Sequence, residues 1–186
     1  MSIPNIITLG RLMAVPLAVY LIMVGELGWA FWTFVAAGVS DALDGFIARA
    51  FRSQTYLGGY LDPLADKALL VSVYVTLGHT GHLPLWLVIM VVFRDVLIIG
   101  GVLLIYTLKE SLAMQPSLSS KLNTVAQILL AGLVLAGEGL ALAGVAFDDA
   151  GYVRVMTWVV AATTAWSGLG YVVQGSRVMN RLGSVK

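Results

Sequence analysis

The sequence predicts an all-α integral membrane protein with six transmembrane helices. Of its 186 residues, 59% are hydrophobic and 11% are charged, and the mean hydropathy is +0.91. Ordinary soluble domains carry about a quarter charged residues, and a membrane-spanning helix needs about 20 mostly apolar residues. Turn or charge signals separate six apolar segments, which run over about Thr8–Val24, Trp29–Ala50, Leu64–Gly78, Leu83–Leu108, Leu122–Ala143 and Tyr152–Gln174.

The composition also limits the class of protein. We see no internal repeat and no linker long enough to divide the chain, so residues 1–186 are expected to form a single membrane domain. A net charge of +1 without a basic run gives no indication of nucleic-acid binding, and the absence of cysteine excludes disulfide and thiolate chemistry. The N-terminus has no basic region ahead of its apolar run and no evident cleavage site, so we expect it to belong to a mature, bacterial protein.

The charged residues between the segments differ in sign from one side to the other. Counted from the N-terminus, one side holds Arg49, Arg52, Lys109, Lys121, Arg177, Arg181 and Lys186. The other side holds Glu26, Glu138, Asp148 and Asp149, with Arg154 as its one basic residue. Because basic residues favour the cytoplasmic side, we expect a multi-pass protein of the bacterial plasma (inner) membrane with both termini in the cytoplasm.

The stretch from Asp41 to Asp66 concentrates carboxylates in an otherwise apolar chain. Asp41 and Asp44 are three residues apart and Asp62 and Asp66 are four apart, so each pair would lie on one face of a helix. Four converging carboxylates repel unless a cation holds them, and ligands that are all oxygen favour Mg²⁺ or Mn²⁺. The sequence therefore predicts a metal site at the cytoplasmic face. The alternative is that these residues cap helices or lie in solvated loops.

Other polar residues interrupt the apolar segments. Arg94 and Asp95 lie inside LWLVIMVVFRDVLIIGG. Adjacent residues of a helix do not face each other, so each is expected to contact a neighbouring helix, although a pair between them is also possible. Lys121 and Asn123 begin a polar face of the fifth segment, which continues to Gln127. For Arg94 and Asp95, a substrate role and a structural role both remain open.

A third polar face lies near the N-terminus. Asn5, Thr8 and Arg11 recur at helical spacing after Pro4, which can open a helix. The alternative to a binding face is a capped interfacial helix whose arginine extends to water along its aliphatic stem.

The stretch Asp41–Asp66 resembles the signature of the CDP-alcohol phosphatidyltransferase family. That signature reads D-x-x-D-G-x-x-A-R, eight residues, then G-x-x-x-D-x-x-x-D. Every fixed place is filled here, by Asp41, Asp44, Gly45, Ala48, Arg49, Gly58, Asp62 and Asp66. The likeness extends from Pro4 to about Gln127.

The resemblance implies an enzyme that transfers a phosphatidyl group from a CDP-linked lipid to an alcohol and releases CMP, with two divalent cations, Mg²⁺ or Mn²⁺. Asp41, Asp44, Asp62 and Asp66 would hold the metals, and Asp66 would also be the catalytic general base. The nucleotide would be bound by Asn5, Thr8, Gly45, Arg49, Thr55 and Gly58. A homodimer is also implied.

Two branches of the family differ in their acceptor alcohol. In the branch that uses glycerol 3-phosphate and makes phosphatidylglycerol phosphate, the fourth helix typically opens with Arg-Glu and carries a second Arg two turns on. This chain has Asp95 and Val102 at those places, and Asn123 where that branch tends to carry Lys. A phosphate monoester carries close to two negative charges and needs more cations. The sequence therefore favours phosphatidylglycerol as acceptor and CMP-forming cardiolipin synthesis from CDP-diacylglycerol, with Arg94, Asp95, Lys121 and Asn123 as candidate acceptor-binding residues.

A cation transporter is the alternative from another class, because transporters also use intramembrane carboxylates. A transport path needs polar groups through the membrane, whereas these carboxylates lie at one face. Transport predicts metal flux without nucleotide, and the enzyme predicts CMP release that requires a divalent ion.

Overall fold

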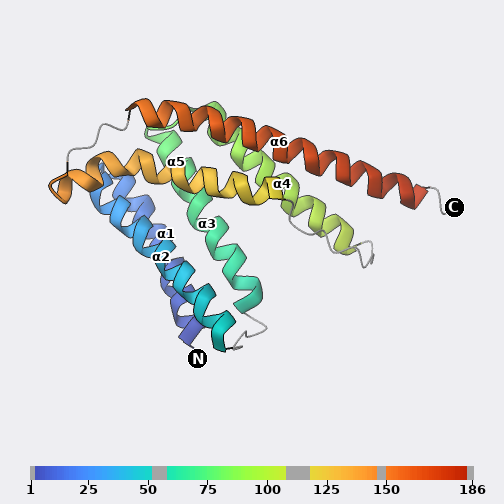
Figure 1. Cartoon of the computed structure of the whole chain (residues 1–186), viewed down its shortest axis with the longest axis horizontal. Helices are drawn as coiled ribbons and strands as arrows, with labels where there is room; N and C mark the ends of the chain where they lie inside the picture. The colour runs from blue at the N-terminus through green and yellow to red at the C-terminus, as the bar shows by residue number, and fades with distance from the viewer. Residues whose placement is uncertain (1–2, 52–57, 108–117, 146–149, 184–186) are drawn as a thin grey trace. The chain divides into compact units, whose positions relative to one another are not determined.

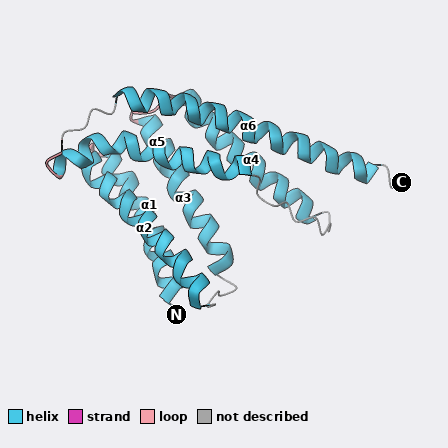
Figure 2. Ribbon diagram, viewed as in Figure 1, coloured by secondary structure: helices cyan, strands magenta, loops and turns pink. Residues whose placement is uncertain are grey.

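The computed structural model describes residues 3–51, 58–107, 118–145 and 150–183, which form six α-helices and no strand (Figures 1 and 2). The helices are α1 (Ile3–Met23), α2 (Leu27–Phe51), α3 (Gly58–His79), α4 (Leu85–Thr107), α5 (Leu118–Leu142) and α6 (Ala150–Gly183). The all-α prediction is confirmed, and each predicted segment corresponds to one helix.

The helix boundaries differ from the apolar segments mainly where polar residues continue a helix. α1 begins at Ile3 rather than near Thr8, and α3 begins at Gly58 rather than near Leu64. Helical backbone conformation does not require apolar side chains, so hydropathy alone does not detect polar residues that begin a helix. Both extensions bring residues of the predicted site into regular helices.

Three described glycines follow helices in the left-handed conformation. Gly25 has a φ of 83° and follows α1, Gly81 has a φ of 82° and follows α3, and Gly144 has a φ of 77° and follows α5. At the first turn, the amides of Gly25 and Glu26 donate to the carbonyls of Ile22 and Leu21 at 3.1 and 2.9 Å. This pattern caps the last helical carbonyls, and the positive φ favours glycine.

The chain divides into two compact units, which are described separately. Unit 1 comprises residues 1–84 and 131–153. Within it α1 packs against both α2 and α3, over a core that includes Ile22, Ala30 and Tyr74. The start of α1, the end of α2 and the start of α3 lie at the same end of this unit (Figure 1).

Unit 1 also includes the C-terminal part of α5. The indole Nε1 of Trp32 in α2 donates to the carbonyl oxygen of Gly139 at 3.2 Å. A Cβ atom at Gly139 would collide with the side chain of Phe31. Glycine is therefore required sterically at this contact between α2 and α5.

Unit 2 comprises residues 85–130 and 154–186 and contains α4, the first part of α5, and α6 from Arg154 onward. Its buried apolar side chains include Leu87, Val91 and Val160. The rings of Trp86 and Trp158 have centroids 5.6 Å apart and join α4 to α6. This core encloses a group of polar side chains from all three helices.

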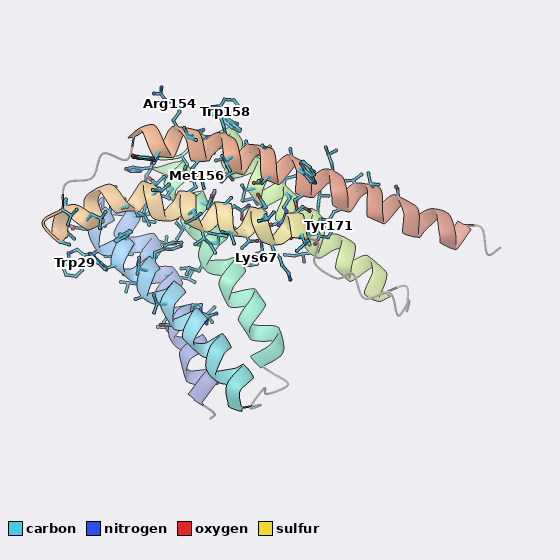
Figure 3. All side chains as sticks on the ribbon, in the orientation of Figure 1. Trp29, Lys67, Arg154, Met156, Trp158 and Tyr171 are labelled. Atoms are coloured by element: carbon cyan, nitrogen blue, oxygen red, sulfur yellow. The ribbon has the colours of Figure 1, made fainter. Side chains whose placement is uncertain are left out.

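Large apolar side chains also lie on the outer faces of the helices. Trp29 and Trp158 project away from α2 and α6 in Figure 3, and both are exposed. Within the described residues, Leu118–Gly137 is long and apolar enough to cross a membrane, and Gly10–Met23 and Leu27–Ser40 are shorter apolar helices. Six spans and the orientation of the termini stay predictions.

Candidate substrate site

The four predicted metal-binding aspartates lie within two helices of unit 1. Asp41 and Asp44 belong to α2, and Asp62 and Asp66 belong to α3. The predicted helical spacing is therefore confirmed, and the alternative that they lie in loops is wrong. The structure does not describe the side chains of these aspartates. A set of four carboxylate ligands without nitrogen or sulfur suits a hard divalent cation.

The predicted nucleotide-binding residues belong to the same helices. Asn5 and Thr8 lie in α1, Gly45 and Arg49 lie in α2, and Gly58 is the first residue of α3. Thr55 and the side chains of the other residues lie outside the described part of the chain. The three helix ends that carry them share one end of unit 1 (Figure 1).

Arg11 follows these residues one turn along α1, and its side chain is described. Only 3% of its surface is exposed. The alternative of an interfacial arginine reaching to water is therefore wrong, because the side chain is buried.

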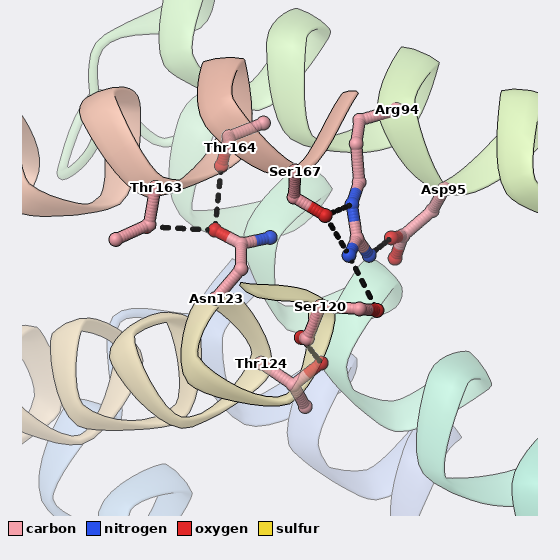
Figure 4. Close-up of polar contacts among 8 residues, drawn as sticks. All are labelled: Arg94, Asp95, Ser120, Asn123, Thr124, Thr163, Thr164 and Ser167. Atoms are coloured by element: carbon pink, nitrogen blue, oxygen red, sulfur yellow. Dashed lines mark hydrogen bonds and ion pairs between the residues drawn. The ribbon is translucent and has the colours of Figure 1, made fainter. Parts of the chain in front are cut away.

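A buried polar cluster in unit 2 centres on Arg94 of α4. The side chain is 3% exposed, and its Nη1 lies 2.6 Å from Oδ1 of Asp95. Nη2 donates to Ser120 Oγ at 2.7 Å and to Ser167 Oγ at 2.6 Å, and Nε donates to Ser167 Oγ at 3.2 Å (Figure 4). Cζ also lies 5.9 Å from the ring centre of Tyr171. One guanidinium therefore connects α4, α5 and α6.

The ion pair between Arg94 and Asp95 is the arrangement that the sequence left open as an alternative. Arg94 contacts neighbouring helices, as expected, and it also pairs with Asp95 within α4. Its long side chain turns back far enough to reach the adjacent carboxylate, which is itself 4% exposed.

Asn123 of α5 extends the cluster toward α6. It is fully buried, and its Oδ1 accepts hydrogen bonds from the hydroxyls of Thr163 and Thr164, each at 2.9 Å. Its Nδ2 has no hydrogen-bond partner among the described residues. In Figure 4 this nitrogen lies on the side of the amide that faces Ser167 and Arg94. Leaving a buried donor unsatisfied costs about 1–3 kcal/mol.

The structure thus brings together three of the four predicted acceptor-binding residues. Lys121 is exposed on α5, and no described hydrogen bond joins it to Arg94 or Asn123. The α6 residues of the cluster were not predicted. Their signal was present in the sequence as Thr163, Thr164 and Ser167, which recur at helical spacing within an apolar helix.

An open apolar groove adjoins the cluster in unit 2. Its volume is about 520 Å³, and it is lined by α5 and α6 through Leu118, Ser119, Leu122, Ala162, Thr163 and Trp166. Thr163 belongs to both features, because its hydroxyl donates to Asn123 Oδ1. The buried polar cluster and the apolar groove are therefore adjacent in this unit.

Known proteins resemble the chain over most of its length. It is 31% identical over 200 residues to a protein of Oryza sativa subsp. japonica named CDP-diacylglycerol–glycerol-3-phosphate 3-phosphatidyltransferase 1, chloroplastic, covering 97% of this chain and 59% of that one. It is 32% identical over 194 residues to proteins named cardiolipin synthase (CMP-forming) from Homo sapiens and Streptomyces coelicolor. These alignments cover 96% of this chain in both cases, and 63% and 85% of the respective relatives.

The chain spans about six tenths of the length of several curated relatives, including the rice and human proteins. A family model described as CDP-alcohol phosphatidyltransferase matches residues 1–166, a range that contains the four aspartates, the residues that line the groove, and the buried cluster except for Ser167 and Tyr171. The chain therefore belongs to the CDP-alcohol phosphatidyltransferase family.

Proposed function

We propose that the protein is a CMP-forming cardiolipin synthase, which transfers a phosphatidyl group from CDP-diacylglycerol to phosphatidylglycerol. The observation that carries the reaction class is the stretch Asp41–Asp66, whose eight fixed residues match the signature of the family to which the chain belongs. The relatives named cardiolipin synthase support this acceptor. The alignment with the Streptomyces protein covers 85% of the length of that relative.

In the proposed reaction, a hydroxyl oxygen of phosphatidylglycerol attacks the phosphorus that carries the diacylglycerol. The new P–O bond replaces the P–O bond to CMP, which leaves with the bridging oxygen. Asp66 takes the proton of the attacking hydroxyl as general base. Arg49 binds the phosphates of the CDP group, for which a guanidinium is well shaped, together with Asn5, Thr8 and Thr55.

Asp41, Asp44, Asp62 and Asp66 would hold two divalent cations, Mg²⁺ or Mn²⁺. When bound, such ions neutralise charge that develops on the pyrophosphate during transfer. Gly45 and Gly58 would leave room for the nucleotide because they have no side chain.

The protein is further proposed to span the bacterial plasma membrane six times as a homodimer, with both termini and the aspartates on the cytoplasmic side. The positive-inside distribution of charge supports this orientation. Exposed tryptophans such as Trp29 and Trp158 support contact with lipid.

The apolar groove of unit 2 and the polar cluster beside it support a lipid as the acceptor. The walls of the groove are almost wholly apolar, which suits a hydrocarbon chain, and Thr163 links it to the hydrogen-bonding groups around Asn123. We propose that one acyl chain of phosphatidylglycerol lies in this groove. Glycerol 3-phosphate, the acceptor in the name of the rice relative, has no such chain, and its use is the second candidate function.

The test measures CMP release by the purified full chain with CDP-diacylglycerol and Mg²⁺. Phosphatidylglycerol and glycerol 3-phosphate are offered separately, and EDTA removes the cation in parallel samples. We expect turnover with phosphatidylglycerol and none after EDTA. Turnover with glycerol 3-phosphate alone would contradict the proposed acceptor and retain the reaction class.

Asp66→Asn tests the catalytic assignment in the same assay. The amide cannot accept the hydroxyl proton, so we expect CMP release to fall by about 100-fold or more. Full activity of Asp66→Asn would remove this residue from the proposed mechanism, whichever acceptor is used.

A further inference from the structure

One surface of unit 2 carries an exposed cation beside an aromatic pair. Arg154 lies in the second turn of α6, and its side chain is exposed. Trp158 follows four residues later, so the two share one face of the helix, and Figure 3 shows both side chains projecting from the same side of α6. The ring centre of Trp158 lies 5.6 Å from that of Trp86, the second residue of α4. A guanidinium and two indoles from two helices therefore form one surface.

The polar groups of this surface are free to bind a ligand. Arg154 makes no ion pair or hydrogen bond through its side chain among the described residues. The indole N–H groups of Trp86 and Trp158 also have no hydrogen-bond partner in the described part of the chain, and the two residues are 46% and 66% exposed. All three groups donate hydrogen bonds and none of them accepts one. They suit an anion with several acceptor oxygens, such as a phosphate group.

Apolar side chains flank these donors on both helices. Val155 lies three residues from Trp158 and is 64% exposed, and Ile89 lies three residues from Trp86 and is 61% exposed. Tryptophan is enriched where a membrane meets water, because its ring is apolar and its N–H group hydrogen-bonds. A free phosphate ion would make no use of the apolar flank. A phospholipid combines acceptor oxygens with hydrocarbon chains and therefore matches both parts of the surface.

We propose that Arg154, Trp158 and Trp86 bind the phosphodiester of an anionic phospholipid, whose acyl chains lie against the apolar side chains of α4 and α6. A zwitterionic lipid is less suitable, because its ammonium group would lie near the guanidinium. The positive-inside count places Arg154 on the side of the membrane opposite to the predicted metal site. This lipid is therefore bound apart from the proposed reaction and is not its substrate.

The alternative role of Arg154 is to offset the charge of Asp148 and Asp149, which precede α6 in the sequence. Arg154→Gln separates the two roles, since it removes the positive charge at an exposed position where substitutions have little effect on folding. Trp158→Phe keeps an aromatic ring and removes the indole N–H group. The matched controls are Arg154→Lys, which keeps the charge, and Trp29→Phe, which makes the same aromatic change at an exposed position of unit 1.

The measurement is native mass spectrometry of the full chain, delipidated in a maltoside detergent and titrated with phosphatidylglycerol. EDTA is present and CDP-diacylglycerol is absent, and every variant is made in an Ala162→Phe parent, whose groove is partly filled. We expect Arg154→Gln to raise the dissociation constant of the first bound lipid by about tenfold, because a charge-assisted hydrogen bond is lost. Trp158→Phe should raise it by about threefold, and Arg154→Lys and Trp29→Phe should bind like the parent.

Equal dissociation constants for Arg154→Gln and its parent would overturn the site and leave Arg154 as a counter-charge. A loss in Trp29→Phe as large as in Trp158→Phe would also overturn it, because any exposed indole would then have the same effect. Displacement of the lipid by excess inorganic phosphate would contradict a phospholipid as the ligand. None of these measurements requires turnover, so CMP release by the wild-type chain tests the proposed function separately.

Discussion

At the scale of single residues, Arg94 shows how a charge can be buried at acceptable cost. Its guanidinium has a carboxylate at 2.6 Å and two hydroxyl acceptors on other helices. A buried pair of this kind adds little net stability compared with apolar residues, but removing one partner leaves an uncompensated charge. Replacing Arg94 or Asp95 alone should therefore destabilise the protein, whereas replacing both with apolar residues should not.

Arg94→Met should lower the free energy of unfolding by about 3–5 kcal/mol, because Asp95 loses its guanidinium partner. Thermal unfolding in detergent, followed by circular dichroism, measures the change. The double variant Arg94→Met/Asp95→Leu should recover most of the loss. Arg154→Met, at an exposed position of α6, should change stability by less than about 0.5 kcal/mol, and equal losses at Arg94 and Arg154 would contradict this account.

At the scale of helices, unit 1 depends on a close approach of α2 and α5. Phe31 occupies the space where Gly139 would carry a side chain, and Trp32 donates to the carbonyl of Gly139. A second feature of the helices is the groove between α5 and α6 in unit 2, where Ala162 forms part of the wall. Gly139 therefore allows two helices to approach closely, whereas Ala162 leaves the groove open, and separate substitutions test the two roles.

Gly139→Ala should destabilise the protein by about 1–3 kcal/mol, because the added methyl group overpacks against Phe31. Gly132→Ala is the matched control on the same helix, where a Cβ atom meets nothing within 4 Å. Alanine should stabilise α5 there by up to about 1 kcal/mol. The thermal unfolding midpoint of each variant measures the change. If both midpoints shift in the same direction, the steric role of Gly139 is refuted.

Ala162→Phe should fill part of the groove and lower the rate with phosphatidylglycerol by about tenfold, because burial of an acyl chain contributes about 0.8 kcal/mol per CH₂ group. Ala165→Phe, exposed on the same helix and outside the groove lining, should leave the rate unchanged. CMP release as a function of phosphatidylglycerol concentration measures both. Similar rates in the two variants would argue against an acyl chain in the groove.

At the scale of the whole molecule, the proposed topology makes opposite predictions for the two sides of the membrane. The chain has no cysteine, so a single introduced thiol reports on one position. Glu26, in the turn after α1, and Lys121, near the start of α5, are both exposed in the structure. The positive-inside rule assigns them to opposite sides.

A membrane-impermeant maleimide should therefore label Glu26→Cys in intact cells. It should label Lys121→Cys only after the membrane is permeabilised, because a charged reagent does not cross the apolar core. Labelling is measured by the shift in mass of the purified chain. Labelling of both positions from outside, in cells shown to be intact, would contradict the six-span arrangement.

The sequence by itself determined the six helices, the helical spacing of Asp41/Asp44 and Asp62/Asp66, and the family. Hydropathy and side-chain spacing are local properties, and the signature Asp41–Asp66 is contiguous in the chain. The described residues do not include Thr55 or the side chains of the four aspartates. The prediction of a single domain is likewise not tested by them.

Only the tertiary structure decided which polar residues of unit 2 meet. The hydrogen bonds of Arg94 to Ser120 and Ser167, and those of Asn123 to Thr163 and Thr164, depend on the rotation of α4, α5 and α6. Helical periodicity gives the polar face of each helix but not its partner. Packing of the apolar faces fixes that rotation, and the buried polar groups then contact whatever the packing brings within hydrogen-bonding distance.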